Sequence, residues 1–165
     1  MDETKYCQVK DDGHLRIVTI NRPEVLNSLH WEAHAELDGV WNDFAANDEL
    51  WVAIVTGTGD RAFSAGNDLK VQAAGKARPK PASGFGGLSR RHDLNKPLIA
   101  AVNGLAMGGG FEIALSCDII VAAKDAQFSD PVVTFGVSGV EWLGHPWELG
   151  ARKAKEFLFT SDVWS

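Results

Sequence analysis

Three short apolar runs constrain the fold of this chain more than any other feature of its sequence. They read "WVAIVTG" (51–57), "KPLIAAVNG" (96–104) and "DIIVAA" (118–123). Runs of this length and composition are typical of buried strands in a parallel sheet. The β-rich segment "LRIVTI" (15–20) and the shorter "AQFSDP" (126–131) are also predicted to contain strands.

Helical patterns separate these strands. The segment from Ser28 to Phe44 places its apolar residues at helical spacing, with Ser28 as the expected N-cap. A second helix is predicted to begin within 108–110 and to run to about Cys117, and a third to span about 147–159. Strands that alternate with helices predict an α/β fold with parallel pairing.

The segment 70–97 differs from the rest in being rich in glycine, proline, serine and basic residues. This composition predicts a surface loop, and long loops often act as lids or binding loops. Within it, Arg90 and Arg91 beside His92 are candidates for contact with phosphate groups. A solvated cluster of charges is the simpler interpretation of the same residues.

Composition bounds the class of protein. A chain of 165 residues has the size of one ordinary domain, and 45% hydrophobic with 23% charged residues indicates a globular protein. The net charge of −6 gives no general affinity for nucleic acid, and no apolar run is long enough to span a bilayer. The polar N-terminal stretch is unlike a signal peptide, and Cys7 and Cys117 are expected to be reduced thiols, which favours the cytoplasm.

The stretch "GLAMGGGFE" (104–112) is the strongest candidate for chemistry. The first N–H groups of a helix lack partners inside the helix and lie at its positive end. A glycine there lets a ligand approach the backbone, so the "GGG" run at the helix start could receive an oxyanion. Glu112 is three residues after Gly109, so both can face the same side of the first turn. The alternatives remain open on these residues alone: Glu112 as a capping-box residue, and glycines that only permit tight helix packing.

Three segments, taken together, are specific enough to indicate a protein family. In the order and spacing of "NRPEVLNSL", "GTGDRAFSAGNDLK" and "KPLIAAVNGLAMGGGFEIALSCDIIVAAKDAQFSDP", the chain resembles the crotonase (enoyl-CoA hydratase/isomerase) superfamily over about residues 10–160. The resemblance implies a single domain over 1–165, built as a spiral of ββα units, that binds an acyl-CoA thioester. It also implies a homo-trimer or hexamer, and coenzyme A as part of the substrate in place of a separate cofactor. No clustered His or Cys set has metal-ligand spacing, so no metal is expected.

The resemblance further implies roles for individual residues. The thioester carbonyl would lie between the backbone N–H groups of Ala65 and Gly109, and Glu112 would be a general acid and base. The implied contacts to coenzyme A or substrate are Val25, Leu26, Ala62, Ser64, Ala65, Asn67, Asp68, Leu69, Gly108, Gly109, Pro131 and Val132.

The chain departs from the family pattern at the second catalytic carboxylate. Hydratases and isomerases of the family carry this acid where the present chain has Val132, and valine cannot exchange a proton. Glu141 is the better candidate for a substitute, although a surface carboxylate is the simpler interpretation of it. Asp130 is a weaker candidate, because the adjacent proline disturbs the geometry. His145 could act as an acid or base, with a capping or surface role expected first.

Family members also continue past "FTSDVWS", so the chain is expected to lack their C-terminal helices. The sequence therefore predicts an acyl-CoA-binding enzyme of the enoyl-CoA hydratase/isomerase type, with hydration itself in question. Two alternatives stay open. One is a catalytically degenerate relative that binds CoA esters, and the other is a different crotonase reaction, such as thioester hydrolysis or decarboxylation.

Overall fold

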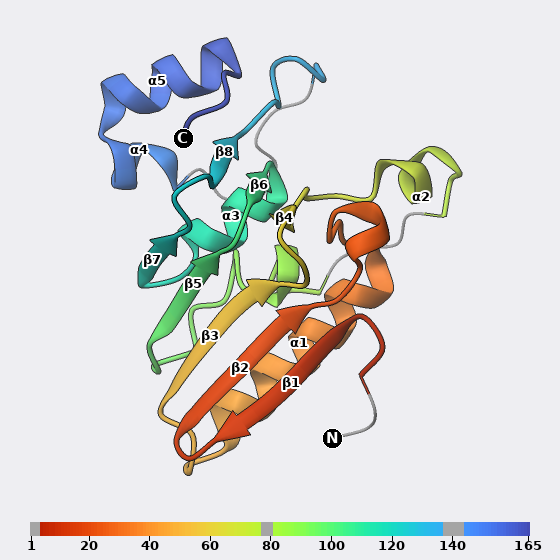
Figure 1. The fold of residues 1–165 in the computed structure, drawn as a ribbon, viewed down its shortest axis with the longest axis vertical. Coiled ribbons are helices and arrows are strands. Elements are labelled where there is room, and N and C mark those ends of the chain that lie inside the picture. The colour runs from red at the N-terminus through yellow and green to blue at the C-terminus, as the bar shows by residue number, and fades with distance from the viewer. Residues whose placement is uncertain (1–3, 77–80, 137–143) are drawn as a thin grey trace.

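A five-stranded sheet forms the larger layer of the protein. The structure is a computed structural model that describes residues 4–76, 81–136 and 144–165 (Figure 1). The order of the strands is β1 (Cys7–Asp12), β2 (Leu15–Ile20), β3 (Val52–Gly57), β5 (Leu98–Val102) and β7 (Ile119–Ala122). β1 pairs antiparallel with β2, and the other pairs are parallel. The predicted strands and the α/β class are confirmed, and β1 is an addition to the prediction.

A smaller sheet consists of three parallel strands in the order β4-β6-β8. They are β4 (Ala62–Ser64), β6 (Leu105–Met107) and β8 (Gln127–Ser129). Because β6 pairs in parallel with both neighbours, the carboxyl ends of all three strands lie at one edge. The segments that follow the strands, beginning at residues 65, 108 and 130, therefore meet at this edge. Ligand sites of parallel sheets lie outside such carboxyl ends.

Helices connect the strands and cover them. They are η1 (Pro23–Val25), α1 (Trp31–Ala46), α2 (Leu69–Ala73), η2 (Phe85–Gly87), α3 (Gly109–Leu115), α4 (His145–Leu149) and α5 (Ala151–Thr160). The N-cap of α1 is His30, whose ring accepts from the Ala33 N–H at 3.3 Å, so the prediction of Ser28 is wrong. The predicted third helix is two helices, because Gly150 adopts φ 74° and ψ 151° between them.

The core extends into a segment that the composition assigned to the surface. Phe85 and Leu88 are 2% and 4% exposed, and the Trp41 indole on α1 donates to the Gly86 carbonyl at 2.9 Å. The loop prediction for 70–97 is therefore wrong over η2. The aromatic and aliphatic side chains of η2 and its flank gain more from burial than the glycines beside them lose in freedom.

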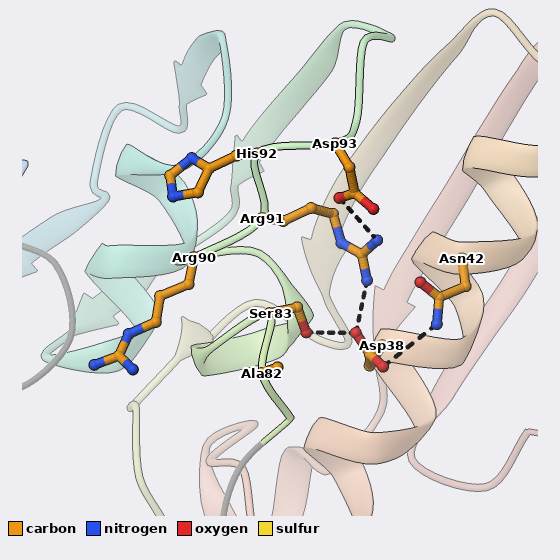
Figure 2. Close-up of a pocket in the computed structure, with 8 residues that line it drawn as sticks. All are labelled: Asp38, Asn42, Ala82, Ser83, Arg90, Arg91, His92 and Asp93. Carbon is orange, nitrogen blue, oxygen red and sulfur yellow. Dashed lines mark hydrogen bonds and ion pairs between the residues drawn. The ribbon is translucent and has the colours of Figure 1, made fainter.

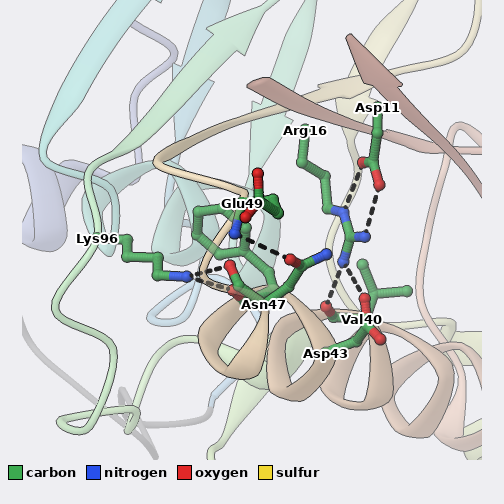
Figure 3. Close-up of polar contacts among 8 residues, drawn as sticks. Asp11, Arg16, Val40, Asp43, Asn47, Glu49 and Lys96 are labelled. Atoms are coloured by element: carbon green, nitrogen blue, oxygen red, sulfur yellow. Dashed lines mark hydrogen bonds and ion pairs between the residues drawn. The ribbon is translucent and has the colours of Figure 1, made fainter. Parts of the chain in front are cut away.

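A buried arginine joins the first sheet to α1. The guanidinium of Arg16 on β2 lies within 2.8 Å of the Asp11 carboxylate and 2.7 Å of the Asp43 carboxylate, as Figure 3 shows. The hydrogen bond to Asp11 raises the pKa of Arg16 further. In the same view the Lys96 ammonium donates to the Asn47 carbonyl at 2.7 Å, which places a cation at the C-terminal end of α1. These contacts join β1, β2 and the segment before β5 to α1.

The edge strand β7 differs from its prediction in burial. Its side chains are exposed, with Ile119 at 52% and Val121 at 59%. β7 pairs with β5 and with no other described strand. The apolar run at 118–123 is therefore a strand, as predicted, but not a buried one within the described part of the chain.

Candidate functional site

The glycine run lies where β6 ends and α3 begins. The Gly108 N–H donates to the Ser129 carbonyl at 2.8 Å, and the Gly108 carbonyl accepts from the Glu112 N–H at 3.0 Å. The Gly109 N–H donates to no backbone oxygen of the described residues. This N–H is therefore available to a ligand oxygen at the positive end of α3, as the sequence predicts.

The other N–H group that the resemblance implied as a donor, that of Ala65, is engaged within the chain. The Ala65 N–H donates to the Leu26 carbonyl at 2.9 Å, so it is occupied within the chain. The segment that follows β4 pairs with the segment after η1, and there the Asp68 N–H donates to Leu29 at 2.9 Å. Between these bonds, the Asn67 N–H has no backbone acceptor among the described residues. In this structure the Ala65 N–H is therefore not free to bind a ligand, and the Asn67 N–H becomes the candidate in its place.

Gly66 brings these two N–H groups close together. Its φ is +83°, and a Cβ at this position would lie 3.0 Å from the Gly109 nitrogen and 2.6 Å from the Met107 carbonyl oxygen. Only glycine tolerates both the backbone conformation and the contact. The segment that carries Asn67 therefore packs directly against the start of α3.

The carboxylate of Glu112 and the ring of Phe85 also lie at the start of α3. Glu112 lies in the first turn of α3, as predicted, and is 7% exposed. A Cβ on Gly109 would lie 2.6 Å from Cε1 and Cε2 of Phe85 and closer still to Cζ, so that ring covers the start of α3. Phe85 in turn packs edge-on against His34, with 4.4 Å between ring centroids. Sequence reasoning missed Phe85, although its place among glycines in "SGFGG" was a usable signal.

Most of the expected ligand-contacting residues follow the strand ends or η1. Those at least partly accessible are Val25, Leu26, Ala65, Asn67, Leu69, Gly108, Gly109, Pro131 and Val132. Ala62 and Ser64 are buried at 1% and 0% exposure, and the Ser64 hydroxyl donates to the Asn27 carbonyl at 2.9 Å. Side-chain contact between these two residues and a ligand is therefore contradicted.

Asp68 holds the loops around the site together. Its carboxylate accepts from the Val71 N–H at 3.2 Å, as N-cap of α2, and pairs with the Arg22 guanidinium at 3.0 Å. Burial favours the protonated acid, but the Val71 N–H and Arg22 outweigh it and lower the pKa of Asp68. The ionised carboxylate thus joins η1 to α2, which is a structural role at a position where ligand contact was expected.

The residues around the missing second carboxylate are arranged differently from expectation. Val132 is half-buried in the turn after β8, and Glu141 lies outside the described residues. His145, expected at the surface, is fully buried, and its Nε2 lies 3.3 Å from Oδ2 of Asp130, which is 1% exposed. Burial raises the pKa of Asp130 to about 6 and lowers that of His145. Sequence reasoning considered each residue separately and missed the pair.

The basic residues of the 70–97 segment line a separate surface pocket, shown in Figure 2. The Arg91 guanidinium lies 2.6 Å from the Asp38 carboxylate on α1, and donates to the Gly87 carbonyl at 2.8 Å. Arg91 therefore fastens the segment to α1. In Figure 2 the Arg90 side chain extends away from this ion pair.

Within the described ranges, no helix is long and apolar enough to cross a membrane. In the same residues, no group of three or more His, Cys, Asp and Glu side chains could hold a metal ion. Cys7 and Cys117 are free thiols, and burial raises the pKa of Cys117 to about 12.

Known proteins resemble this chain in both sequence and structure. It is 44% identical over 131 residues to the mevalonyl-coenzyme A hydratase of Aspergillus fumigatus, an alignment of 77% of this chain and 48% of that protein. It is 37% identical over 161 residues to the short-chain-enoyl-CoA hydratase of Clostridium acetobutylicum, covering 93% of this chain and 61% of the relative. The chain thus spans about half to three fifths of the length of these relatives.

Solved structures of this group share the fold. A carnitinyl-CoA hydratase from Mycobacterium avium superposes with a TM-score of 0.90 over 99% of this chain and 64% of its own, at 29% identity. The spiral of ββα units is therefore confirmed. The family model for enoyl-CoA hydratase/isomerase matches residues 11–165. The chain therefore belongs to the enoyl-CoA hydratase/isomerase family, the crotonase superfamily.

Proposed function

We propose that the chain binds an acyl-CoA thioester whose carbonyl oxygen accepts hydrogen bonds from the backbone N–H groups of Gly109 and Asn67. The observation that carries this proposal is a pair of N–H groups at the carboxyl ends of β4 and β6 that have no backbone acceptor among the described residues and that Gly66 brings together. When water adds to an α,β-unsaturated thioester, negative charge develops on that oxygen. Fixed donors stabilise this charge most in the transition state.

The reaction that we propose is hydration of an enoyl-CoA or its reversal. The names of the similar proteins include hydratases and a dehydratase that act on CoA esters. Glu112 would exchange a proton with water or with the α-carbon of the substrate. Because Val132 cannot supply the second acid, the rate should lie roughly 10²–10⁴-fold below that of a two-carboxylate site, unless another group such as Glu141 replaces it. Coenzyme A enters as part of the substrate.

Amide chemical shifts test the binding site directly. Crotonyl-CoA is titrated into the ¹⁵N-labelled chain, with free coenzyme A as the control ligand. The thioester should shift the Gly109 and Asn67 amide resonances more than coenzyme A does, and the Ala65 resonance should move little. An Ala65 response larger than that of Asn67 would restore the original assignment. No response to either ligand would overturn the proposed function.

Turnover distinguishes hydration from the alternatives. Loss of the enoyl absorbance of crotonyl-CoA is followed for the wild type and for Glu112→Gln, Glu141→Gln and Val132→Glu. We expect Glu112→Gln to abolish hydration and Val132→Glu to raise it. Release of free thiol without loss of the enoyl group would indicate thioester hydrolysis. Binding without turnover would indicate a catalytically degenerate relative. A cytoplasmic homo-trimer or hexamer is the proposed assembly, and light scattering measures its mass.

A further inference from the structure

We propose that Asp130 and His145 form a positioning pair that fastens α4 to the end of β8 and thereby holds the Gly108–Gly109 backbone in place for the thioester oxygen. The inference rests on the proposed function, since it gives the pair a role in orienting the Gly109 N–H. A proton bound by the pair would reside either on the imidazole of His145 or on the carboxyl group of Asp130. Neither is required to touch the substrate.

The surroundings of the pair leave each group with one polar neighbour. Both side chains are 1% exposed or less, and Nε2 lies 3.3 Å from Oδ2. None of their four nitrogen and oxygen atoms makes a hydrogen bond within the described residues, so the ion-pair contact between Nε2 and Oδ2 is the polar interaction that the structure gives them. The imidazole packs against the rings of Phe111 and Phe157, with centroids 5.4 and 5.6 Å away. Ionisable groups in such apolar surroundings are costly unless they are paired.

A short chain of contacts links the pair to the donor site. Asp130 directly follows Ser129, whose carbonyl accepts from the Gly108 N–H at 2.8 Å, and Gly109 is the next residue. A second connection runs through Phe111, which lies in the first turn of α3 and packs against the His145 ring. A shift of the pair would therefore move both the strand that anchors Gly108 and the helix that begins at Gly109.

Proton linkage gives the pair a signature that a simple packing contact lacks. Burial raises the pKa of Asp130 from 3.8 to about 6, and lowers the pKa of His145 from 6.5. Burial is the cause of both shifts, and the described side chains that pack on the imidazole from α3 and α5 are the uncharged Phe111 and Phe157. With both groups present, a proton lost by one can be held by the other, which flattens the dependence of stability on pH.

The two single substitutions should make the stability of the folded state depend on pH in opposite directions. In His145→Phe, Asp130 remains with a raised pKa, so the folded state binds more protons and stability should fall as the pH rises from about 4 to 6. In Asp130→Asn, His145 remains with a lowered pKa, so the unfolded state binds more protons and stability should fall as the pH drops below about 6.5.

Urea unfolding of the 165-residue chain across this range measures the slopes, with His145→Gln replacing His145→Phe if the latter does not fold. Opposite slopes in the two single variants, and a flatter profile in the wild type, would support the pair. The same slope in the wild type and both variants would overturn it.

Thioester binding tests the positioning role. Calorimetry with crotonyl-CoA at neutral pH should show Asp130→Asn and the His145 variant binding about 10-fold more weakly, because small displacements of a donor are costly. Asp43→Asn is the matched control: it also replaces an ion-paired carboxylate, here 2.7 Å from Arg16, and should bind as the wild type does. Without ligand, the Gly109 amide resonance should move in Asp130→Asn and stay in Asp43→Asn.

The two proposals fail in different ways. Wild-type affinity and an unmoved Gly109 resonance in folded Asp130→Asn would overturn the positioning role and leave the proposed function standing. A wild-type chain that binds no crotonyl-CoA would overturn both.

Discussion

Replacing Gly110 by alanine tests the close approach of α3 to β4, on which the geometry of the site depends. A Cβ at this position would lie 2.7 Å from the Ser64 carbonyl carbon and closer still to its oxygen. Carbon atoms pack at about 3.5–4.0 Å, so α3 would have to move by roughly 1 Å. Since the obstacle is backbone, no side-chain rotation relieves it.

The expected change in the stability of Gly110→Ala follows from two opposing effects. Overpacking of a buried site costs up to about 3 kcal/mol, and the higher helix propensity of alanine returns about 1 kcal/mol. The net loss of about 2 kcal/mol should lower the Tm of a chain of this size by about 4–8 °C. Affinity for crotonyl-CoA should fall as well, because the start of α3 moves with the helix.

Circular dichroism melting measures this effect, and Gly39→Ala is the control. Gly39 lies in α1, and a Cβ there would meet nothing within 4 Å. The control should gain about 1 kcal/mol and melt about 2–4 °C higher than the wild type. If Gly110→Ala melted at or above the wild type, the packing of α3 against β4 described here would be wrong.

Three further predictions concern the support of the site. Glu36→Ala removes the carboxylate that accepts from the N–H groups of Tyr6 and Cys7, both at 2.7 Å, and should cost about 2 kcal/mol in urea unfolding; a loss below about 0.5 kcal/mol would count against it. Trp41→Phe removes the 2.9 Å bond to Gly86 and should cost about 1–2 kcal/mol, and an unchanged midpoint would contradict the anchoring of η2. Burial raises the pKa of Cys117 to about 12 and that of Cys7 above its ordinary range, so both thiols should resist alkylation in the native state at mildly alkaline pH and react in urea. Fast labelling of the native protein, followed by mass spectrometry, would contradict the raised pKa values of the two thiols.

The locally determined features could be predicted from the sequence. The apolar runs became β3, β5 and β7, and the helix predicted to start within 108–110 begins at Gly109. Hydrophobic periodicity and the special conformations of glycine act over a few residues, so they can be detected without knowing the fold. Two such locally determined features are the start of α3 and the position of Glu112 in its first turn.

Burial was predicted less well, because it depends on what packs from elsewhere in the chain. Phe85 lies in a segment whose composition indicates a loop, yet α1 and α3 enclose it. Conversely, the apolar β7 is exposed at the edge of its sheet. Composition records what a segment could bury, and the neighbouring elements decide whether it does.

The sequence by itself determined the fold class, the family and the glycine-initiated helix with Glu112. Only the tertiary structure decided which backbone N–H groups have a partner. The Ala65 N–H donates a hydrogen bond to the Leu26 carbonyl, and the Asn67 N–H donates to no backbone carbonyl of the described residues. It also brought Asp130 and His145 together in an apolar pocket. Hydrogen-bond partners and the burial of charges are set by segments distant in sequence, and their positions follow from the packing of the whole chain.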